Sequence, residues 1–268
     1  MPPTATTQTT PSLPTLAARR SFNRFELKYL LKREDIPAFT ASLAPWVFPD
    51  PHAGPDGAYR VASLYYDTND YRCYWEKIEG IRFRRKLRVR VYESDTPLVA
   101  ETPVFVEIKQ RLNRVTQKRR VVLPYTDALA LAGDGEIPAH EPRDAATIDE
   151  IAAMTIGYGL RPVDITAYQR TALVGGDEDA GLRITFYADL RYKVCDPELH
   201  DPAPGIPMLD PTRVVLEIKV NDRIPYWLTE IVGAHNCRLV RISKYAQALE
   251  AAGTMPRSIF FHGIEGSN

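Results

Sequence analysis

Apolar and polar residues alternate along several stretches of the chain, with the period of two that is typical of strands covered on one face. The run FRRKLRVRVY at 83–92 is the most informative example. Val, Ile, Tyr and Phe, which favour extended backbone, fill many of the apolar positions. Strands are predicted at 22–31, 59–67, 82–92, 104–111, 115–123, 162–174, 182–187 and 213–220.

Segments of helical pattern separate these strands. Helices are predicted at 34–43, 126–132, 145–157, 226–234 and 244–252, and a turn or helix at 69–80. Many strands with modest helices and few two-residue hairpin signals favour an α+β protein built around a closed or nearly closed antiparallel sheet. The segment 195–212 contains five prolines and is expected to be a surface loop.

The domain organisation follows from where apolar residues are scarce. Residues 1–20 are rich in Thr and Pro, which is typical of a disordered leader. We expect one domain at 21–253 and a tail at 254–268. No apolar run approaches the roughly 18 residues of a membrane-spanning helix, and no signal peptide is evident, so a cytoplasmic protein is expected.

Composition limits the kinds of partner. The 34 Lys and Arg residues balance 34 Asp and Glu residues, so no net field favours nucleic acid or an anionic membrane. An anion site must therefore come from local concentration of charge. The three cysteines are far apart, and the five histidines lack metal-ligand spacing, which argues against a disulfide framework and a structural zinc site.

The strand at 82–92 concentrates charge on one face. Because side chains alternate along a strand, its even-numbered residues share one face, and Phe83, Leu87, Val89 and Val91 share the other. Five cations side by side repel one another unless water, salt or an anion lies against them. These cations are Arg82, Arg84, Lys86, Arg88 and Arg90.

A glutamate–apolar–lysine unit recurs on other predicted strands, at 26–28, 107–109 and 217–219. The strand from Arg183 to Asp189 likewise places polar side chains on one side. If these faces converge inside a barrel, Lys and Arg could clamp phosphate oxygens while Glu holds Mg²⁺ or Mn²⁺. Buried charge is costly, so such an interior would be filled with water or ligand, as a tunnel is. The alternative is an ordinary solvated basic face.

Nine short motifs in order resemble a known family. They are RFELKY at 24–29, SLYYDT at 63–68, YWEKIEG at 74–80, KLRVRVY at 86–92, VEIK at 106–109, YQR at 168–170, RITFYAD at 183–189, LEIK at 216–219 and RISKY at 241–245. Together they resemble the polyphosphate polymerase domain of the vacuolar transporter chaperone (VTC) group, part of the triphosphate tunnel metalloenzyme superfamily. The resemblance covers about residues 22–252 and implies an antiparallel β-barrel tunnel with a basic interior and peripheral helices.

The resemblance also implies site residues. The reacting phosphates would be held by Lys28, Arg88, Arg90, Lys109 and Lys244. The bound nucleotide or polymer would be held by Lys77, Lys118, Arg170, Arg183 and Arg241, and Lys86 joins this set through its strand face. Glu217 would bind the metal, with Glu26 a second candidate. The superfamily's hydrolases often carry a glutamate where this chain has Arg24, which weakens a purely hydrolytic interpretation.

Three functions remain open on these residues. The first is metal-dependent phosphoryl transfer from a nucleoside triphosphate, such as ATP, to polyphosphate, phosphate or pyrophosphate. The second is hydrolysis of inorganic triphosphate or a nucleotide, with Glu26 and Glu107 sharing the metal or general-base role. The third is a non-catalytic module that binds nucleotide or polyphosphate. We expect neither a phosphate-sensing domain nor a membrane domain in the same chain. A separate membrane-protein partner at the inner membrane stays an open alternative.

Overall fold

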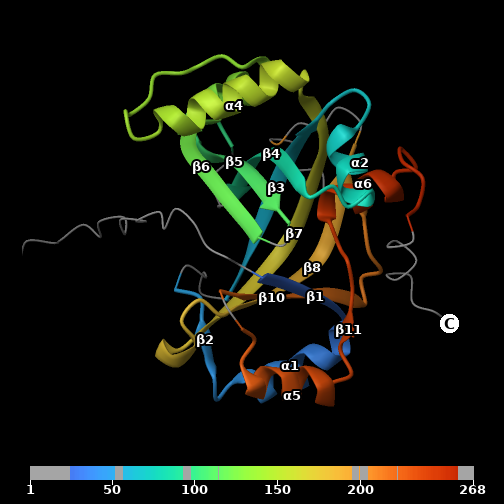
Figure 1. Cartoon of the computed structure of the whole chain (residues 1–268). Coiled ribbons are helices and arrows are strands. Elements are labelled where there is room, and N and C mark those ends of the chain that lie inside the picture. The colour runs from blue at the N-terminus through green and yellow to red at the C-terminus, as the bar shows by residue number, and fades with distance from the viewer. Residues whose placement is uncertain are drawn as a thin grey trace, which may run out of the picture.

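We describe a computed structural model that defines residues 25–51, 57–92, 98–113, 115–194, 199, 205–221 and 223–258 (Figure 1). The strands are β1 Phe25–Lys32, β2 Val47–Pro49, β3 Ala58–Asp67, β4 Phe83–Tyr92, β5 Pro103–Leu112, β6 Val115–Pro124, β7 Arg161–Gly175, β8 Arg183–Lys193, β9 Ile206–Pro207, β10 Arg213–Val220 and β11 Arg238–Leu239. The helices are α1 Ile36–Leu43, α2 Arg72–Ile78, α3 Tyr125–Asp134, α4 Ala145–Tyr158, α5 Tyr226–Ala234 and α6 Lys244–Ala251, with short 3₁₀ turns at Arg33–Asp35 and Asp177–Asp179.

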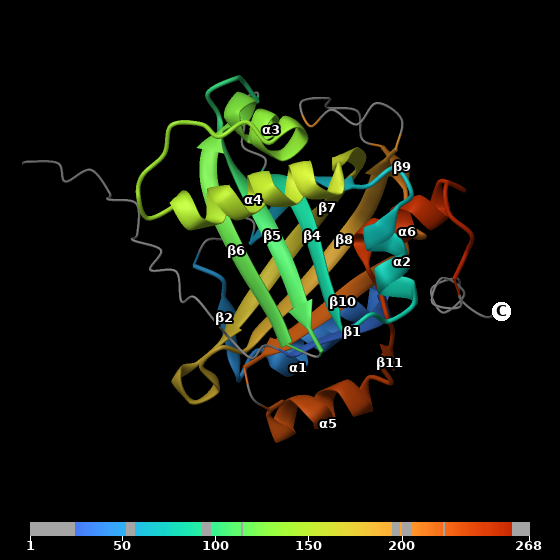
Figure 2. The same ribbon diagram turned by 45° about the horizontal axis from the view of Figure 1, so that its top comes forward.

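The strands form one antiparallel sheet in the order β11-β1-β10-β8-β7-β3-β4-β5-β6, with β2 paired to β7 and β9 to β8. The sheet is strongly curved, and β1 and β10 lie beneath β4, β5 and β6 in both views (Figures 1 and 2). Between the described parts of β6 and β1 no backbone pairing closes the ring. The α+β antiparallel architecture is therefore confirmed, whereas a closed barrel is not shown.

The predicted strands and helices are present in the structure, with small differences in where they begin and end. β8 continues to Lys193, beyond the predicted end at 187, because its last part pairs with β7 on one edge and with Ile206–Pro207 on the other. That pairing also corrects the prediction of a loop throughout 195–212, of which 195–198 and 200–204 lie outside the described residues. The first residues of the strand predicted at 22–31 also lie outside them, as do the leader and most of the tail.

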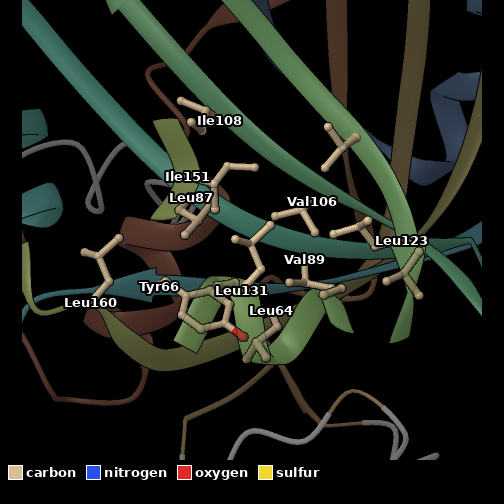
Figure 3. Packing of buried hydrophobic residues seen from close by; sticks show 14 of the residues in the cluster. Leu64, Tyr66, Leu87, Val89, Val106, Ile108, Leu123, Leu131, Ile151 and Leu160 are labelled. Carbon is tan, nitrogen blue, oxygen red and sulfur yellow. The ribbon is translucent and has the colours of Figure 1, made fainter. Parts of the chain in front are cut away.

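The main core lies between the outer face of β3–β6 and the helices α3 and α4. Leu87 and Val89 of β4 and Val106 and Ile108 of β5 point to this side, where they pack with side chains such as Leu131 (Figure 3). All of these side chains are fully buried. Alternation then requires the even-numbered residues of β4 and the odd-numbered residues of β5 to face the other way.

Four further helices pack on the sheet, α1 and α5 on its outer side and α2 and α6 at one end of its concave side. α1 and α5 pack against β1, β8 and β10 around Phe39, Ile184, Leu216 and Leu228. Both helices lie below β1 and β10 in Figure 1. α2 and α6 pack together beside β3 and β7. The outer side is thus occupied by apolar packing, which leaves charged side chains to the concave side. No helix in the described ranges is both long and apolar enough to cross a membrane.

Candidate functional site

Charged side chains from seven elements gather on the concave side of the sheet, and we call them the inner-face cluster. Strand alternation places most of them there, and Lys244 comes from the first turn of α6. The cluster holds nine cations and three carboxylates by this definition. Its members are Glu26, Lys28, Lys86, Arg88, Arg90, Glu107, Lys109, Lys118, Arg170, Glu217, Lys219 and Lys244.

Glu107 is the buried centre of one half of the cluster, with 0% of its surface exposed. Arg88 donates from Nε at 2.8 Å and approaches with Nη2 at 2.6 Å, both to Glu107 Oε2. Lys118 Nζ donates to Oε1 at 2.8 Å, and Arg90 Nη1 lies 3.6 Å from Oε2. Burial alone would raise the pKa of the Glu107 carboxyl, but Arg88, Arg90 and Lys118 hold this pKa well below its usual value.

Strand register produces this arrangement. Arg88 is directly opposite Glu107 in the β4–β5 pair, which places opposite charges side by side. One step along, Lys86, Lys109 and Lys118 occupy one row across β4, β5 and β6. Three cations in one row repel one another, and an anion bound along the row would relieve this repulsion. Lys109 and Lys118 keep 36% and 40% of their side-chain surface exposed, so solvent reaches this row.

Glu217 is the buried centre of the other half. Its Oε1 accepts a hydrogen bond from the Tyr187 hydroxyl at 2.7 Å and lies 2.6 Å from Lys219 Nζ. Lys28 Nζ lies 3.3 Å from Oε2 and also donates to the Ile242 carbonyl oxygen at 2.8 Å. Burial opposes ionisation of Glu217, but the neighbouring lysines, led by Lys219 and Lys28, keep its pKa well below the usual value. Glu217 is therefore a carboxylate at neutral pH.

Glu26 connects the two halves. Lys109 Nζ lies 3.1 Å from its Oε1 and 3.0 Å from its Oε2. Burial raises the pKa of Glu26, but Lys109, with smaller contributions from Lys219 and Lys28, outweighs this and the repulsion of Glu217, so that the pKa falls to about 2. Each of the three carboxylates thus has at least one cation beside it.

Lys244 sits over two tyrosine rings at the start of α6. Its Nζ lies 3.3 Å from the centroid of the Tyr187 ring and 4.6 Å from that of Tyr168, contacts that favour a cation. Burial nevertheless lowers the pKa of Lys244 well below its usual value, and the attraction of Glu217 offsets only part of this. A polyanion beside Lys244 would restore its charge.

Two arginines differ in how well they are satisfied. Arg90 donates from Nε to Ser63 Oγ at 3.0 Å and from Nη2 to the Tyr168 hydroxyl at 3.1 Å. Arg170 lies 5.4 Å from the centroid of the Tyr59 ring, and its buried Nε has no hydrogen-bond partner among the described atoms. A buried guanidinium with an unused N–H group is poised to bind an oxyanion.

The remaining predicted residues lie at the margins. Arg183 of β8 forms an ion pair with the buried Asp50. Lys77 of α2 is half-buried, and burial lowers its pKa to about 8 with help from nearby Arg84, Lys28 and Arg241. Arg241 itself is exposed. The structure thus brings Lys28, Lys86, Arg88, Arg90, Lys109, Lys118, Arg170, Lys244, Glu26 and Glu217 into the cluster.

Several residues that contact the inner-face cluster or belong to it were not predicted from the sequence. Lys219 contacts Glu217, and it could have been found because the same glutamate–apolar–lysine unit identified Lys28 and Lys109. Tyr168 and Tyr187 hold Arg90, Glu217 and Lys244, but a tyrosine in a strand is more often a core residue. Alternation along 183–189 had already placed Tyr187 with the polar side chains of that strand, whereas the position of Tyr168 was visible only once the register was known.

The carboxylates determine how a metal could bind. Across the described residues no group of three His, Cys, Asp or Glu side chains could cage an ion. Glu26 and Glu217 stand on paired strands as diagonal neighbours on one face, because Glu26 lies opposite Lys219 and Glu217 lies opposite Lys28. Mg²⁺ in particular is usually held by one or two carboxylates together with substrate phosphates. This pair of oxygen donors therefore fits a divalent ion that arrives with a phosphate ligand.

Comparison with known proteins identifies the family. The VTC domain profile matches residues 23–252. Vacuolar transporter chaperone complex subunit 4 of Trypanosoma brucei brucei (strain 927/4 GUTat10.1) is 26% identical over 274 residues, covering 85% of this chain and 34% of its own. The same subunit of Trypanosoma cruzi (strain CL Brener) is 26% identical over 278 residues, with the same shares. The chain thus spans about a third of the length of these relatives.

Among solved structures, the chain is similar to a Hippeastrum protein that is described as a putative adenylyl cyclase with a dominant triphosphatase activity. It is 11% identical, with a TM-score of 0.46, and the match covers 86% of this chain and 95% of that one. The family profile matches most of the chain, from the first residues of the sheet to the end of α6, and so the chain belongs to the VTC domain family.

Proposed function

We propose that this protein is a metal-dependent polyphosphate polymerase that transfers the terminal phosphate of a nucleoside triphosphate, ATP in the first instance, to a growing polyphosphate chain. The observation that carries the proposal is the inner-face cluster, with nine cations against three carboxylates. A surplus of buried and half-buried positive charge is costly unless an anion offsets it. A chain of phosphates carries repeated negative charge and matches a row of cations better than a single small anion does.

The chemistry of the cluster suits phosphoryl transfer. This reaction needs in-line positioning and neutralisation of charge more than a covalent nucleophile. In the proposed mechanism, Arg88 and Arg90 clamp the transferred phosphoryl group, and Lys28 and Lys109 neutralise its oxygens. Lys118 and Arg170 hold the neighbouring phosphates, and Lys244 gains its proton as the polyanion binds.

Glu217 and Glu26 would hold Mn²⁺ or Mg²⁺ together with phosphate oxygens. The ion would supply further neutralisation of charge on the phosphates. We assign Glu107 a different role, because two arginines and a lysine surround its carboxylate and its side chain has no exposed surface. It holds these three cations in position, which argues against Glu107 as the base of a hydrolase.

The curved sheet supports a tunnel in which the phosphate chain passes between β1 and β5, although its closure is part of the proposal. The trypanosome relatives are named as subunits of a complex. We extend this to a cytoplasmic protein that works beside a separate partner, and a membrane protein that receives the polymer would fit this role.

The test is to incubate the protein with ATP and Mn²⁺ or Mg²⁺ and to compare it with Glu217→Gln and Arg88→Ala. Glu217→Gln is expected to lose metal-dependent turnover while retaining the fold, because the amide can still accept from Tyr187. Arg88→Ala is expected to weaken nucleotide binding. Glu230→Gln on the exposed side of α5 is the matched control. Full activity in both variants would contradict the assignment.

A further inference from the structure

Three half-buried aromatic side chains stand on the inner face of the sheet, much of which is charged. They are Tyr59 of β3, Tyr92 of β4 and Phe105 of β5. The Tyr59 and Tyr92 ring centroids are 5.8 Å apart, and those of Tyr92 and Phe105 are 5.4 Å apart. Tyr59 and Tyr92 border a core cluster, whereas Phe105 belongs to none that the described residues form. Core packing therefore does not account for the whole of this aromatic group.

Strand register places these rings next to cations of the proposed reaction. Phe105 is directly opposite Arg90 in the β4–β5 pair, and Tyr59 is directly opposite Arg170 in the β3–β7 pair. Tyr92 lies two residues beyond Arg90 on the same face of β4. The rings and the cations are therefore parts of one continuous surface.

Two arginines flank the aromatic group. The Arg120 guanidinium lies 4.9 Å from the Phe105 ring centroid, and that of Arg170 lies 5.4 Å from the Tyr59 ring centroid. Arg170 also keeps a buried Nε without a hydrogen-bond partner among the described atoms. Aromatic rings stack on any nucleobase, because every base has a π-face, and arginines beside them suit the phosphates of a nucleotide.

The two ends of these strands differ in their chemistry. Beyond the row that holds Lys86, Arg84 lies directly opposite Arg111, so cations continue toward that end of the β4–β5 pair. The Tyr245 ring beside Lys86 is buried, so no base could stack on it. A phosphate chain suits the end with the cations, and a nucleoside suits the end with the partly exposed rings.

We propose that Tyr59, Tyr92 and Phe105 form the binding site for the base of the nucleoside triphosphate. Arg88 is four residues from Tyr92 along β4, about 13 Å at the rise of an extended strand, which leaves room for the ribose and phosphates between them. The polyphosphate then lies beyond the transferred phosphoryl group, along the row of Lys86. This inference rests on the proposed binding of a nucleoside triphosphate to the inner-face cluster, and adds the direction in which the nucleotide lies.

The base can be tested apart from the phosphates, because inorganic triphosphate has no base. Calorimetric titration of the non-hydrolysable imido analogues of ATP and of inorganic triphosphate compares the wild-type protein with Phe105→Leu. This variant keeps an apolar side chain but loses the π-face. The ATP analogue should bind to it about tenfold more weakly, which is within the range for stacking of a base on an aromatic side chain. The triphosphate analogue should bind to both proteins equally.

Phe83→Leu is the matched control. Phe83 lies on the outer face of β4 with 44% of its surface exposed, and the Arg85 guanidinium is 5.5 Å from its ring centroid. The control thus removes a ring beside an arginine, away from the inner face, and should change neither affinity. Unchanged binding of the ATP analogue to Phe105→Leu would overturn the proposal. An equal loss of affinity for both analogues would also overturn it, because such a loss does not depend on the base.

A second measurement uses the wild-type protein, in case Phe105→Leu does not fold. Irradiation with 8-azidoadenosine triphosphate, followed by peptide mapping, should place the label on peptides that contain Tyr59, Tyr92 or Phe105. An excess of ATP should prevent this labelling. Specific label on the peptides that contain Arg84 or Arg111 would reverse the direction of the nucleotide and overturn the proposal.

The outcomes separate this inference from the proposed function. A protein that makes polyphosphate, and whose affinity for the ATP analogue does not depend on the Phe105 ring, keeps the proposed function and loses the base site. A protein that makes no polyphosphate, but loses affinity for the ATP analogue alone in Phe105→Leu, keeps the base site and loses the polymerase assignment. A wild-type protein that binds neither analogue overturns both.

Discussion

Lys109 on β5 forms an ion pair with Glu26 on β1, with 3.0 Å between Lys109 Nζ and Glu26 Oε2, although these strands are far apart in the order of the sheet. The contact is made across the concave side and not along a strand pair. It shows that the sheet curls until side chains from near its two ends meet. The charged faces of strands distant in sequence therefore form one cluster.

This contact predicts a measurable coupling between β1 and β5. A double-mutant cycle with Lys109→Met and Glu26→Gln should give a coupling free energy of about 0.5–1 kcal/mol, as for other partly exposed pairs. The free energy of unfolding of the four proteins in urea supplies the measurement. A coupling of zero would mean that the two side chains do not meet in solution.

Removing the charge of Glu107 should lower the free energy of unfolding by much more than loss of the Lys109–Glu26 pair does. Glu107→Gln leaves Arg88, Arg90 and Lys118 without their common carboxylate, and breaking a buried ion pair costs about 3–5 kcal/mol. Urea unfolding at neutral pH measures this loss, with the exposed Glu101→Gln as control. A loss below about 1 kcal/mol would show that the cations do not depend on Glu107.

The same residue contributes to acid unfolding. Because the pKa of Glu107 is lower in the folded protein than in the unfolded chain, its contribution is present at neutral pH. That contribution is lost as the pH falls through the lowered pKa. Glu107→Gln should therefore show a shallower decline in stability with acid than the wild-type protein.

Arg170 is predicted to favour binding at the expense of stability. Arg170→Met removes a buried cation with an unpartnered Nε, so the free energy of unfolding should rise by about 1–2 kcal/mol and Tm by about 2–8 °C. Triphosphate binding should weaken by roughly tenfold or more, the contribution of a charge-assisted hydrogen bond. Arg143→Met, at an exposed position, should change neither quantity. A less stable variant with unchanged affinity would contradict this role.

Triphosphate affinity should depend on pH through Lys118. Burial lowers the pKa of Lys118 to about 8, against the attraction of Glu107, so this side chain loses its charge as the pH rises through that value. Affinity measured from about pH 6 to about pH 10 should therefore fall above pH 8. Lys118→Arg stays charged over that range and should decline less steeply, whereas the exposed Lys32→Arg should match the wild type. Identical profiles for Lys118→Arg and the wild type would contradict the prediction.

Much of the architecture could be predicted from local pattern. Alternation along 83–92 correctly divided Leu87 and Val89 from Arg88 and Arg90, because a strand has only two faces. The same rule placed Glu107 with Lys109 and Glu217 with Lys219. The short strands β2 and β11 were missed, since two or three residues are too few to show a period.

What the pattern could not supply is the pairing between distant strands. The contact of Glu26 with Lys109 depends on the curvature of the whole sheet. The contact of Lys244 with the Tyr187 ring depends on the position in which α6 packs against the sheet. The shift in the β3–β7 register at Val163 likewise arises from packing and is not visible in a run of residues.

Polymerase activity can be measured by incubating the purified protein with ATP and Mn²⁺ or Mg²⁺, separating the products on a phosphate gel and measuring free phosphate. We expect long-chain polyphosphate that depends on the metal and disappears in Glu217→Gln. Free phosphate without polymer would contradict the polymerase assignment and favour a hydrolase. Bound nucleotide with neither product would contradict catalysis altogether and favour a binding module.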